Sequence, residues 1–264
     1  MRYEILGPVR VVGVGGARAL AAAKPEILLA ALLARRDQVL TVDQLVAELW
    51  AADDPARPRQ VRPTVHVYVS RLRSFLRASA PARSRSIVTT AGGYVLRSTP
   101  EVALDADEFH HLVEQGREAS RAGRRREGAE RYAAALKLWR GAPYERVEAG
   151  PIVRAHAARL DAARLDCQEL LVEAQFELGR YRESVARLYA LTAEYPLHEA
   201  FARQLMIALH VCGRRADALV VYRDSRARLR ELLGLEPGEP LREAHRAVLA
   251  GTEPPGLRTH SLAH

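Results

Sequence analysis

One helical segment carries the residues whose types and spacing could do chemistry. A helical wheel over residues 59–78 gathers a cationic and polar face that holds Arg62, His66, Val67, Ser70, Arg71, Arg73, Ser74 and Arg77. Arginine can read guanine through two hydrogen bonds, serine can bond to either base of a pair, and valine can touch a thymine methyl group. The alternative is an ordinary solvated face, where acidic partners are expected four residues away, and none occurs here.

The distribution of charge along the chain favours contact with a polyanion. The 264 residues include 40 Lys and Arg against 32 Asp and Glu, a formal net charge of +8. The first hundred residues hold 15 basic and 7 acidic side chains, which accounts for the whole excess. From Pro55 to Pro100 there are nine arginines and no acidic residue. Such an uncompensated stretch attracts nucleic acid, although a solvated charge run remains the alternative.

The segments around this helix predict the elements that position it. Short β-branched runs with glycine and proline over residues 3–16 predict a small antiparallel sheet with hairpin turns. Helices are expected over residues 25–36, 42–50 and 59–78, and a strand-turn-strand over 87–96. The first of these helices is expected to bury one face, and Thr41 is expected to cap the second. This order is typical of a winged helix-turn-helix.

The sequence of the second half of the chain predicts amphipathic helices that contain a repeat. Gly179 and Gly213 are 34 residues apart, the tetratricopeptide period, and a small side chain follows each by five residues, Ser184 and Ala218. A third glycine, Gly123, is out of register. We therefore predict a mainly α fold with small β elements: a winged helix-turn-helix domain at 1–98 and an all-α, tetratricopeptide-like domain at 99–251. Residues 98–104 are expected to form a linker, and 252–264 a disordered tail.

Several stretches resemble one family. Residues 62–73, Arg-Pro-Thr-Val-His-Val-Tyr-Val-Ser-Arg-Leu-Arg, resemble the recognition helix of the OmpR-type winged helix domain, specifically that of the Streptomyces antibiotic regulatory protein family. Residues 45–50 resemble its second helix, and Gly93-Tyr94 its wing. Leu104-Asp105 with Phe109, and residues 135–141 and 231–238, resemble parts of its bacterial transcriptional activation domain. The resemblance covers roughly residues 3–250.

The resemblance implies a sequence-specific DNA-binding activator, expected to control a secondary-metabolite (antibiotic) gene cluster. Its implied partners are double-stranded DNA with direct repeats, bound as a dimer, and RNA polymerase, through its sigma or alpha subunit. The implied contacts are Arg62, His66, Val67, Ser70 and Arg71 with bases in the major groove; Arg59, Thr64, Arg73 and Arg77 with the DNA backbone; Thr90, Gly92, Gly93 and Tyr94 in the wing; and Asp53, Asp54 and Arg57 with polymerase. Because Thr90 stands where related wings carry an arginine, Arg83, Arg85 and Arg97 are alternative backbone contacts.

The sequence gives less support to an enzyme or a metal site. No Ser/His/Asp order, HExxH or Walker motif is present, so neither an enzyme nor a catalytic residue is expected. Asp105 and Asp107 are expected to stabilise a helix N-terminus, and the adjacent His110 and His111 cannot converge on one metal. The two cysteines, Cys167 and Cys212, read as core residues, and no metal or cofactor is expected.

No signal peptide or apolar span is evident, which predicts a cytoplasmic protein without a membrane partner. No receiver domain precedes the first strand, so a small stand-alone regulator is expected. Two alternatives stay open. One is a tetratricopeptide-type interaction adaptor without sequence-specific DNA binding, and the other is RNA binding, which usually needs exposed aromatic side chains.

Overall fold

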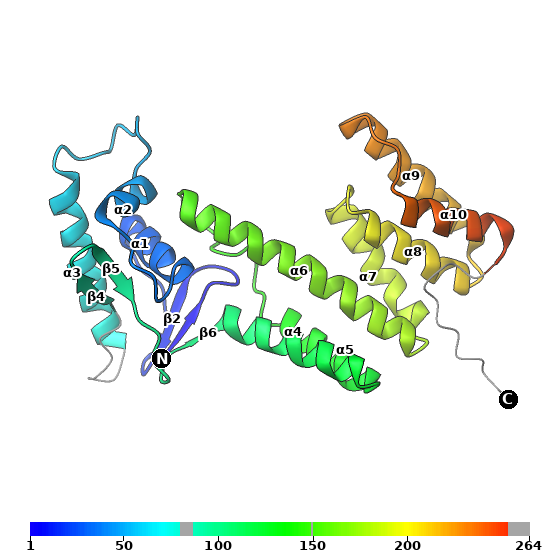
Figure 1. Ribbon diagram of the computed structural model, residues 1–264, viewed down its shortest axis with the longest axis horizontal. Helices are drawn as coiled ribbons and strands as arrows, with labels where there is room; N and C mark the ends of the chain where they lie inside the picture. The colour runs from blue at the N-terminus through cyan, green and yellow to red at the C-terminus, as the bar shows by residue number, and fades with distance from the viewer. Residues whose placement is uncertain (80–86, 149, 253–264) are drawn as a thin grey trace. The chain divides into compact units, whose positions relative to one another are not determined.

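The computed structural model describes residues 1–79, 87–148 and 150–252 (Figure 1). The chain divides into two compact units. The first comprises Met1–Glu114 and Ala134–Asp166, and the second comprises Gln115–Ala133 and the residues from Cys167 onward. The first unit therefore joins the winged-helix elements to the opening of the helical region, across the boundary at residue 98 that the sequence predicts.

The first unit begins with a four-stranded sheet. Its strands, in the order in which they pair, are β3 (Gly16–Arg18), β2 (Arg10–Gly13), β1 (Arg2–Glu4) and β6 (Ala103–Leu104). The antiparallel pairs β1–β2 and β2–β3 confirm the predicted hairpins. The linker prediction for 98–104 is wrong at its end, because Ala103 and Leu104 pair in parallel with Arg2 and Tyr3 of β1. An open strand edge offers unpaired amide and carbonyl groups, which these two residues satisfy.

Three helices and a hairpin follow, which confirms the predicted order. They are α1 (Ala23–Ala34), α2 (Val42–Leu49), α3 (Val61–Ser79), β4 (Ile87–Thr90) and β5 (Gly93–Leu96). Thr41 caps α2 as predicted, in a capping box with Gln44. Helix α1 differs from its prediction, because all seven residues from Ile27 to Leu33 are buried rather than one face. Contacts of α1 with α2, α3 and β5 explain this, since α1 is the central helix of the domain.

Helix α3 has the two faces that the helical wheel predicts. Val65, Val69, Leu72 and Leu76 are buried, and α3 packs on α1, α2 and β2. The opposite face is exposed along the length of the helix. The buried stripe holds α3 in place and leaves its cationic side available to a partner.

The second half of the chain is a helical array. Its helices are α4 (Asp105–Arg121), α5 (Arg125–Leu136), α6 (Pro151–Glu177), α7 (Tyr181–Glu194), α8 (Glu199–Val211), α9 (Arg215–Leu233) and α10 (Glu239–Ala250). Gly179 and Gly213 adopt φ values of 73° and 78° between paired helices, a left-handed conformation that favours glycine. Ser184 and Ala218 are fully buried, so the 34-residue repeat marks sites of close helix packing. The array is tetratricopeptide-like, as predicted.

Three further expectations concern the rest of the chain. Cys167 is buried as expected, whereas Cys212 is only partly buried. Within the described ranges, no helix is both long and apolar enough to cross a membrane. The predicted tail lies, from residue 253 onward, outside the described residues.

Candidate nucleic-acid interface

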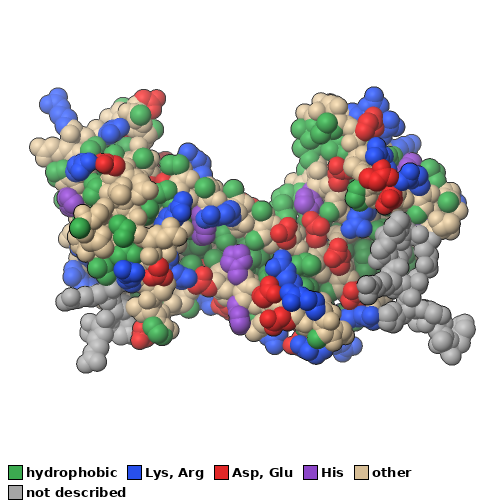
Figure 2. Space-filling view, in the orientation of Figure 1, with side chains coloured by type: hydrophobic (Ala, Val, Ile, Leu, Met, Phe, Trp, Pro, Cys, Tyr) green, Lys and Arg blue, Asp and Glu red, His purple; other side chains and the backbone are tan. Residues whose placement is uncertain are grey.

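The exposed face of α3 brings together the side chains that the sequence assigns to base contacts. Arg62, His66, Val67, Ser70 and Arg71 are all exposed. Val67 stands out, because 48% of its surface is accessible although it is an apolar residue in a well-packed domain. Lys and Arg side chains are spread over the winged-helix elements, among hydrophobic and uncharged ones (Figure 2). The face thus combines cations, hydroxyls and an apolar side chain, which are groups that can contact base edges in a major groove.

Arg62 has a partner that the sequence pattern did not reveal. Its Nη2 atom lies 2.7 Å and 2.9 Å from the two carboxylate oxygens of Asp43, at the start of α2. Both side chains are largely exposed, at 63% and 73%. The absence of acidic residues four positions away on α3 gives no indication of this pair, because Asp43 lies on another helix.

A polar network joins α3 to the wing. The Nδ1 atom of His66 contacts the Tyr94 hydroxyl, and the Arg73 guanidinium lies 5.6 Å from the centre of the Tyr94 ring. Arg73 also donates to the Ile87 carbonyl at 3.1 Å and 3.2 Å, and to the Thr89 hydroxyl at 2.8 Å. Tyr94 is only 5% exposed. Tyr94 and Arg73, which the sequence assigns to DNA contacts, have their polar groups on protein partners, so they position His66 and the wing.

The wing turn is fixed at one end and exposed at its tip. Gly93 has φ of 150°, and a Cβ atom on it would lie 2.0 Å from the Leu40 carbonyl oxygen. The backbones of Leu40 and Tyr94 exchange hydrogen bonds of 2.8 Å and 2.9 Å. Thr90 donates to the Gly93 carbonyl at 3.3 Å, and Gly92 is exposed. Gly93 therefore has a structural role, Gly92 lies at the exposed tip, and Thr90 is half-buried beside it.

The other residues predicted to contact the DNA backbone differ in how far protein contacts already hold their side chains. Thr64 is tied to its own helix by a 2.8 Å bond to the Gln60 carbonyl. Arg77 is exposed and lies 3.1 Å from the Ser74 hydroxyl, and Arg59 is exposed just before α3. Arg97 is exposed after β5, whereas Arg83 and Arg85 lie outside the described residues.

The loop between α2 and α3 is organised by turn contacts. Asp54 accepts a bond from the Ala56 amide at 2.8 Å, and its carboxylate lies 3.7 Å from the Lys24 ammonium. The Arg57 guanidinium reaches the Ala52 carbonyl at 3.5 Å. Asp53 is exposed. Of the two acids assigned to polymerase contact, Asp54 thus serves the loop itself and Asp53 faces outward.

A buried carboxylate joins α2 to the start of α6. Glu48 is 3% exposed, and it accepts bonds from the backbone amides of Ile152 at 2.9 Å and Val153 at 3.0 Å. These amides belong to the first turn of α6, where no helical carbonyl is available to them. Glu48 therefore caps a helix more than a hundred residues away. The sequence gives one indication that Glu48 is buried, because it lies beside Leu45 and Leu49 on the apolar side of α2.

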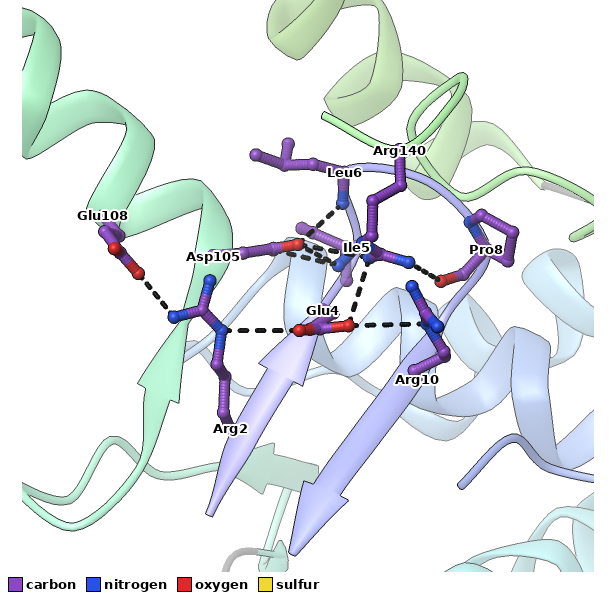
Figure 3. Close-up of polar contacts among 9 residues, drawn as sticks. All are labelled: Arg2, Glu4, Ile5, Leu6, Pro8, Arg10, Asp105, Glu108 and Arg140. Carbon is purple, nitrogen blue, oxygen red and sulfur yellow. Dashed lines mark hydrogen bonds and ion pairs between the residues drawn. The ribbon is translucent and has the colours of Figure 1, made fainter. Parts of the chain in front are cut away.

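A second buried carboxylate joins β1 to the start of α4 (Figure 3). Asp105 is 1% exposed and accepts bonds from the amides of Ile5, at 2.9 Å and 3.0 Å, and Leu6, at 3.1 Å. Its carboxylate also lies 3.4 Å from the Arg140 guanidinium. Burial raises the pKa of Asp105, and the amide bonds and Arg140 oppose that rise. The helix-capping prediction therefore misses the main partners of Asp105, which come from the two residues that follow β1, while the carboxylate of Asp107 pairs with Arg36.

The loop after α5 completes this junction. The backbone amide of Arg140 donates to the Leu6 carbonyl at 2.7 Å, and that of Tyr144 donates to the Ile5 carbonyl at 2.9 Å. The Tyr144 hydroxyl lies 2.6 Å from Nδ1 of His156 on α6. Burial lowers the pKa of His156 to about 4, so this histidine is neutral at pH 7. Among the described residues, no group of three or more His, Cys, Asp or Glu is placed to hold a metal ion.

Two family models cover most of the chain. Residues 21–96 match the model described as "Transcriptional regulatory protein, C terminal", and residues 104–249 match "Bacterial transcriptional activator domain". Regulatory protein DnrI of Streptomyces peucetius is 33% identical, over 94% of this chain and 92% of that protein. Transcriptional regulator RedD of Streptomyces coelicolor is 35% identical, over 95% of this chain and 71% of that protein. The chain belongs to the Streptomyces antibiotic regulatory protein family.

Longer proteins and a solved structure agree with this membership. Regulatory protein AfsR of Streptomyces griseus is 34% identical over 96% of the chain, but the chain spans only 25% of that protein's length. A structure of Mycobacterium tuberculosis EmbR in complex with a low-affinity phosphopeptide superposes with a TM-score of 0.86 at 28% identity. That match covers 95% of this chain and 65% of EmbR. RedD is named a transcriptional regulator, and DnrI and AfsR are named regulatory proteins.

Proposed function

We propose that the chain is a sequence-specific DNA-binding activator of transcription that controls a secondary-metabolite gene cluster. Residues 1–98 serve as the DNA-binding domain and residues 99–251 as the activation domain. The observation that carries the proposal is the exposed α3 face, which presents Arg62, Arg71 and Arg77 with no acidic residue on the same helix. Helix α3 enters the major groove, and the tip of the wing lies over the adjacent backbone.

Two protomers bind side by side on a direct repeat, because DNA sites in the same orientation place two copies of the chain head to tail. The loop between α2 and α3 touches the sigma or alpha subunit of RNA polymerase through Asp53 and Arg57, and the helical domain completes the activating contact. Support for the loop comes from the exposure of both side chains, since a charged tip can meet an oppositely charged polymerase surface.

The test is DNA binding by the full chain at several salt concentrations. Two duplexes of equal length are compared by fluorescence anisotropy: the DNA upstream of the chain's own gene and a random sequence. Each phosphate contact releases counterions, so we expect affinity that falls steeply with salt, and tighter binding to the upstream DNA. Weak binding to both duplexes, with little dependence on salt, would favour the interaction adaptor instead.

A variant pair locates the binding surface. Arg71→Ala removes a cation from the exposed face of α3, and Arg223→Ala removes one from an exposed position on α9. Both variants lose the same charge. The proposal requires Arg71→Ala to weaken binding to the upstream DNA and Arg223→Ala to leave it close to the wild-type value. Equal weakening by the two variants would show that general charge, and not the α3 face, drives binding.

A further inference from the structure

The ion pair between Arg62 and Asp43 has no evident role in the stability of the domain. Both side chains are more than half exposed, and exposed ion pairs of this kind contribute little to folding. The pair is also the one carboxylate contact that the structure shows for the arginines of α3 within the described residues. The pair lies at the N-terminal end of α3, where the residues proposed to face DNA begin. A role in DNA binding is therefore a better explanation for the pair than a role in folding.

The position of Asp43 is well defined. The capping box of Thr41 and Gln44 fixes the first turn of α2, and Asp43 lies in that turn. Arg62 lies in the first turn of α3, where the partial positive charge of a helix N-terminus disfavours a cation. The Asp43 carboxylate neutralises Arg62 there and holds its guanidinium in one orientation.

We infer that Asp43 is a specificity-determining residue, which restrains Arg62 so that it is released or shared only where the DNA offers a suitable base acceptor. The inference rests on the proposed function. On a random duplex, Arg62 stays paired and the carboxylate repels nearby phosphates, which lowers affinity. On the correct site, a guanine offers the two acceptors that an arginine prefers, and they offset the loss of Asp43. Discrimination thus comes from a penalty on wrong sites as well as from contacts with the right one.

The experiment is a double-mutant cycle. The chain is measured by anisotropy as wild type, Asp43→Asn, Arg62→Ala and the double variant, on the upstream DNA and on the random duplex. Asp224→Asn is the matched control, because it removes the same charge from an exposed residue on α9, to which no binding role is assigned. Thermal unfolding of each variant checks that it is folded.

We expect Asp43→Asn to raise affinity for random DNA more than affinity for upstream DNA, so that the ratio of the two falls about tenfold, the discrimination that one good arginine–base pair provides. In the Arg62→Ala background the same change should leave the ratio unaltered, and Asp224→Asn should change it little.

Three results would overturn the inference. If the wild type discriminates and Asp43→Asn leaves the ratio unchanged, the inference fails and the proposed function stands. If the ratio falls equally without Arg62, Asp43 acts through α2 alone, as a helix N-terminal charge would. If the wild type does not prefer the upstream DNA, both the inference and the proposed function fail.

Discussion

Two carboxylates on the short helix α2 have opposite surroundings. Asp43 is exposed and pairs with Arg62 on the candidate DNA-binding face. Glu48 is buried and caps the first turn of α6. Loss of the first contact should destabilise the fold little, because it is exposed, whereas the second joins α2 to the start of α6. In the proposed function, surface charge near α3 serves recognition, whereas the buried charge of Glu48 connects α2 to α6.

The largest expected effect lies at Glu48. Glu48→Ala leaves two backbone amides without acceptors in a buried site, so we expect the free energy of unfolding to fall by about 3 kcal/mol, as measured by urea denaturation at pH 7. Glu48→Gln keeps one acceptor and should lose less. A loss from Glu48→Ala below about 1 kcal/mol would show that water or a rearranged helix end replaces the carboxylate.

On the exposed face of α3, substitutions should affect DNA binding and not the stability of the fold. Arg71→Ala is expected to weaken binding to the preferred site by about 1–3 kcal/mol and to alter base preference. Arg77→Ala should weaken binding to all sequences and reduce the salt slope by about one unit. Binding measured across a set of single-base variants of the site separates the two roles. Equal losses on specific and random DNA for both variants would remove the distinction.

The free energy of unfolding should depend on pH through His156, which contacts Tyr144 in the loop after α5. Because the folded pKa of His156 is about 4 against 6.5 for an ordinary histidine, the unfolded chain takes up a proton first as pH falls. The contribution to stability is full above about pH 6.5 and is lost progressively toward pH 4. Its size is no more than about 2 kcal/mol, since His156 is partly exposed. His156→Gln should flatten this part of the urea-derived stability profile, and an unchanged profile would assign the pH dependence to other groups.

The smallest effect on stability is expected at Asp43. Asp43→Asn removes an exposed ion pair and a helix N-terminal charge, so the free energy of unfolding should fall by less than about 1 kcal/mol. The same urea experiment as for Glu48 provides the comparison. A loss as large as that of Glu48→Ala would mean that the exposed pair is structural, and the contrast between the two carboxylates would disappear.

Much of this architecture could be predicted from the sequence, because local patterns determine it. The apolar stripe of α3, the Thr41 cap and the glycine at 179 each act within a few residues of their own position. The exposed face of α3 followed from the same stripe, since the residues that are not buried on an amphipathic helix face outward.

The parts that could not be predicted depend on contacts between distant residues. Strand β6 forms only because β1 offers a free edge, and Asp105 meets the amides of Ile5 and Leu6 across a hundred residues of sequence. The partner of Arg62 lies on another helix, and Tyr94 turns inward because β5 is buried along its whole length. A helical wheel reports which residues share a face, but it does not show what another element brings to them.

Methylation protection is the experiment best suited to ask whether α3 reads bases in the major groove. Dimethyl sulfate modifies guanine N7, which lies in that groove. We expect the full chain to protect guanines in two equally oriented repeats upstream of its own gene, and Arg71→Ala to lose protection at the same position of each repeat. If guanine N7 stays fully reactive in the bound complex, or if protection is identical for wild type and Arg71→Ala, then α3 does not read these bases through Arg71 in the major groove.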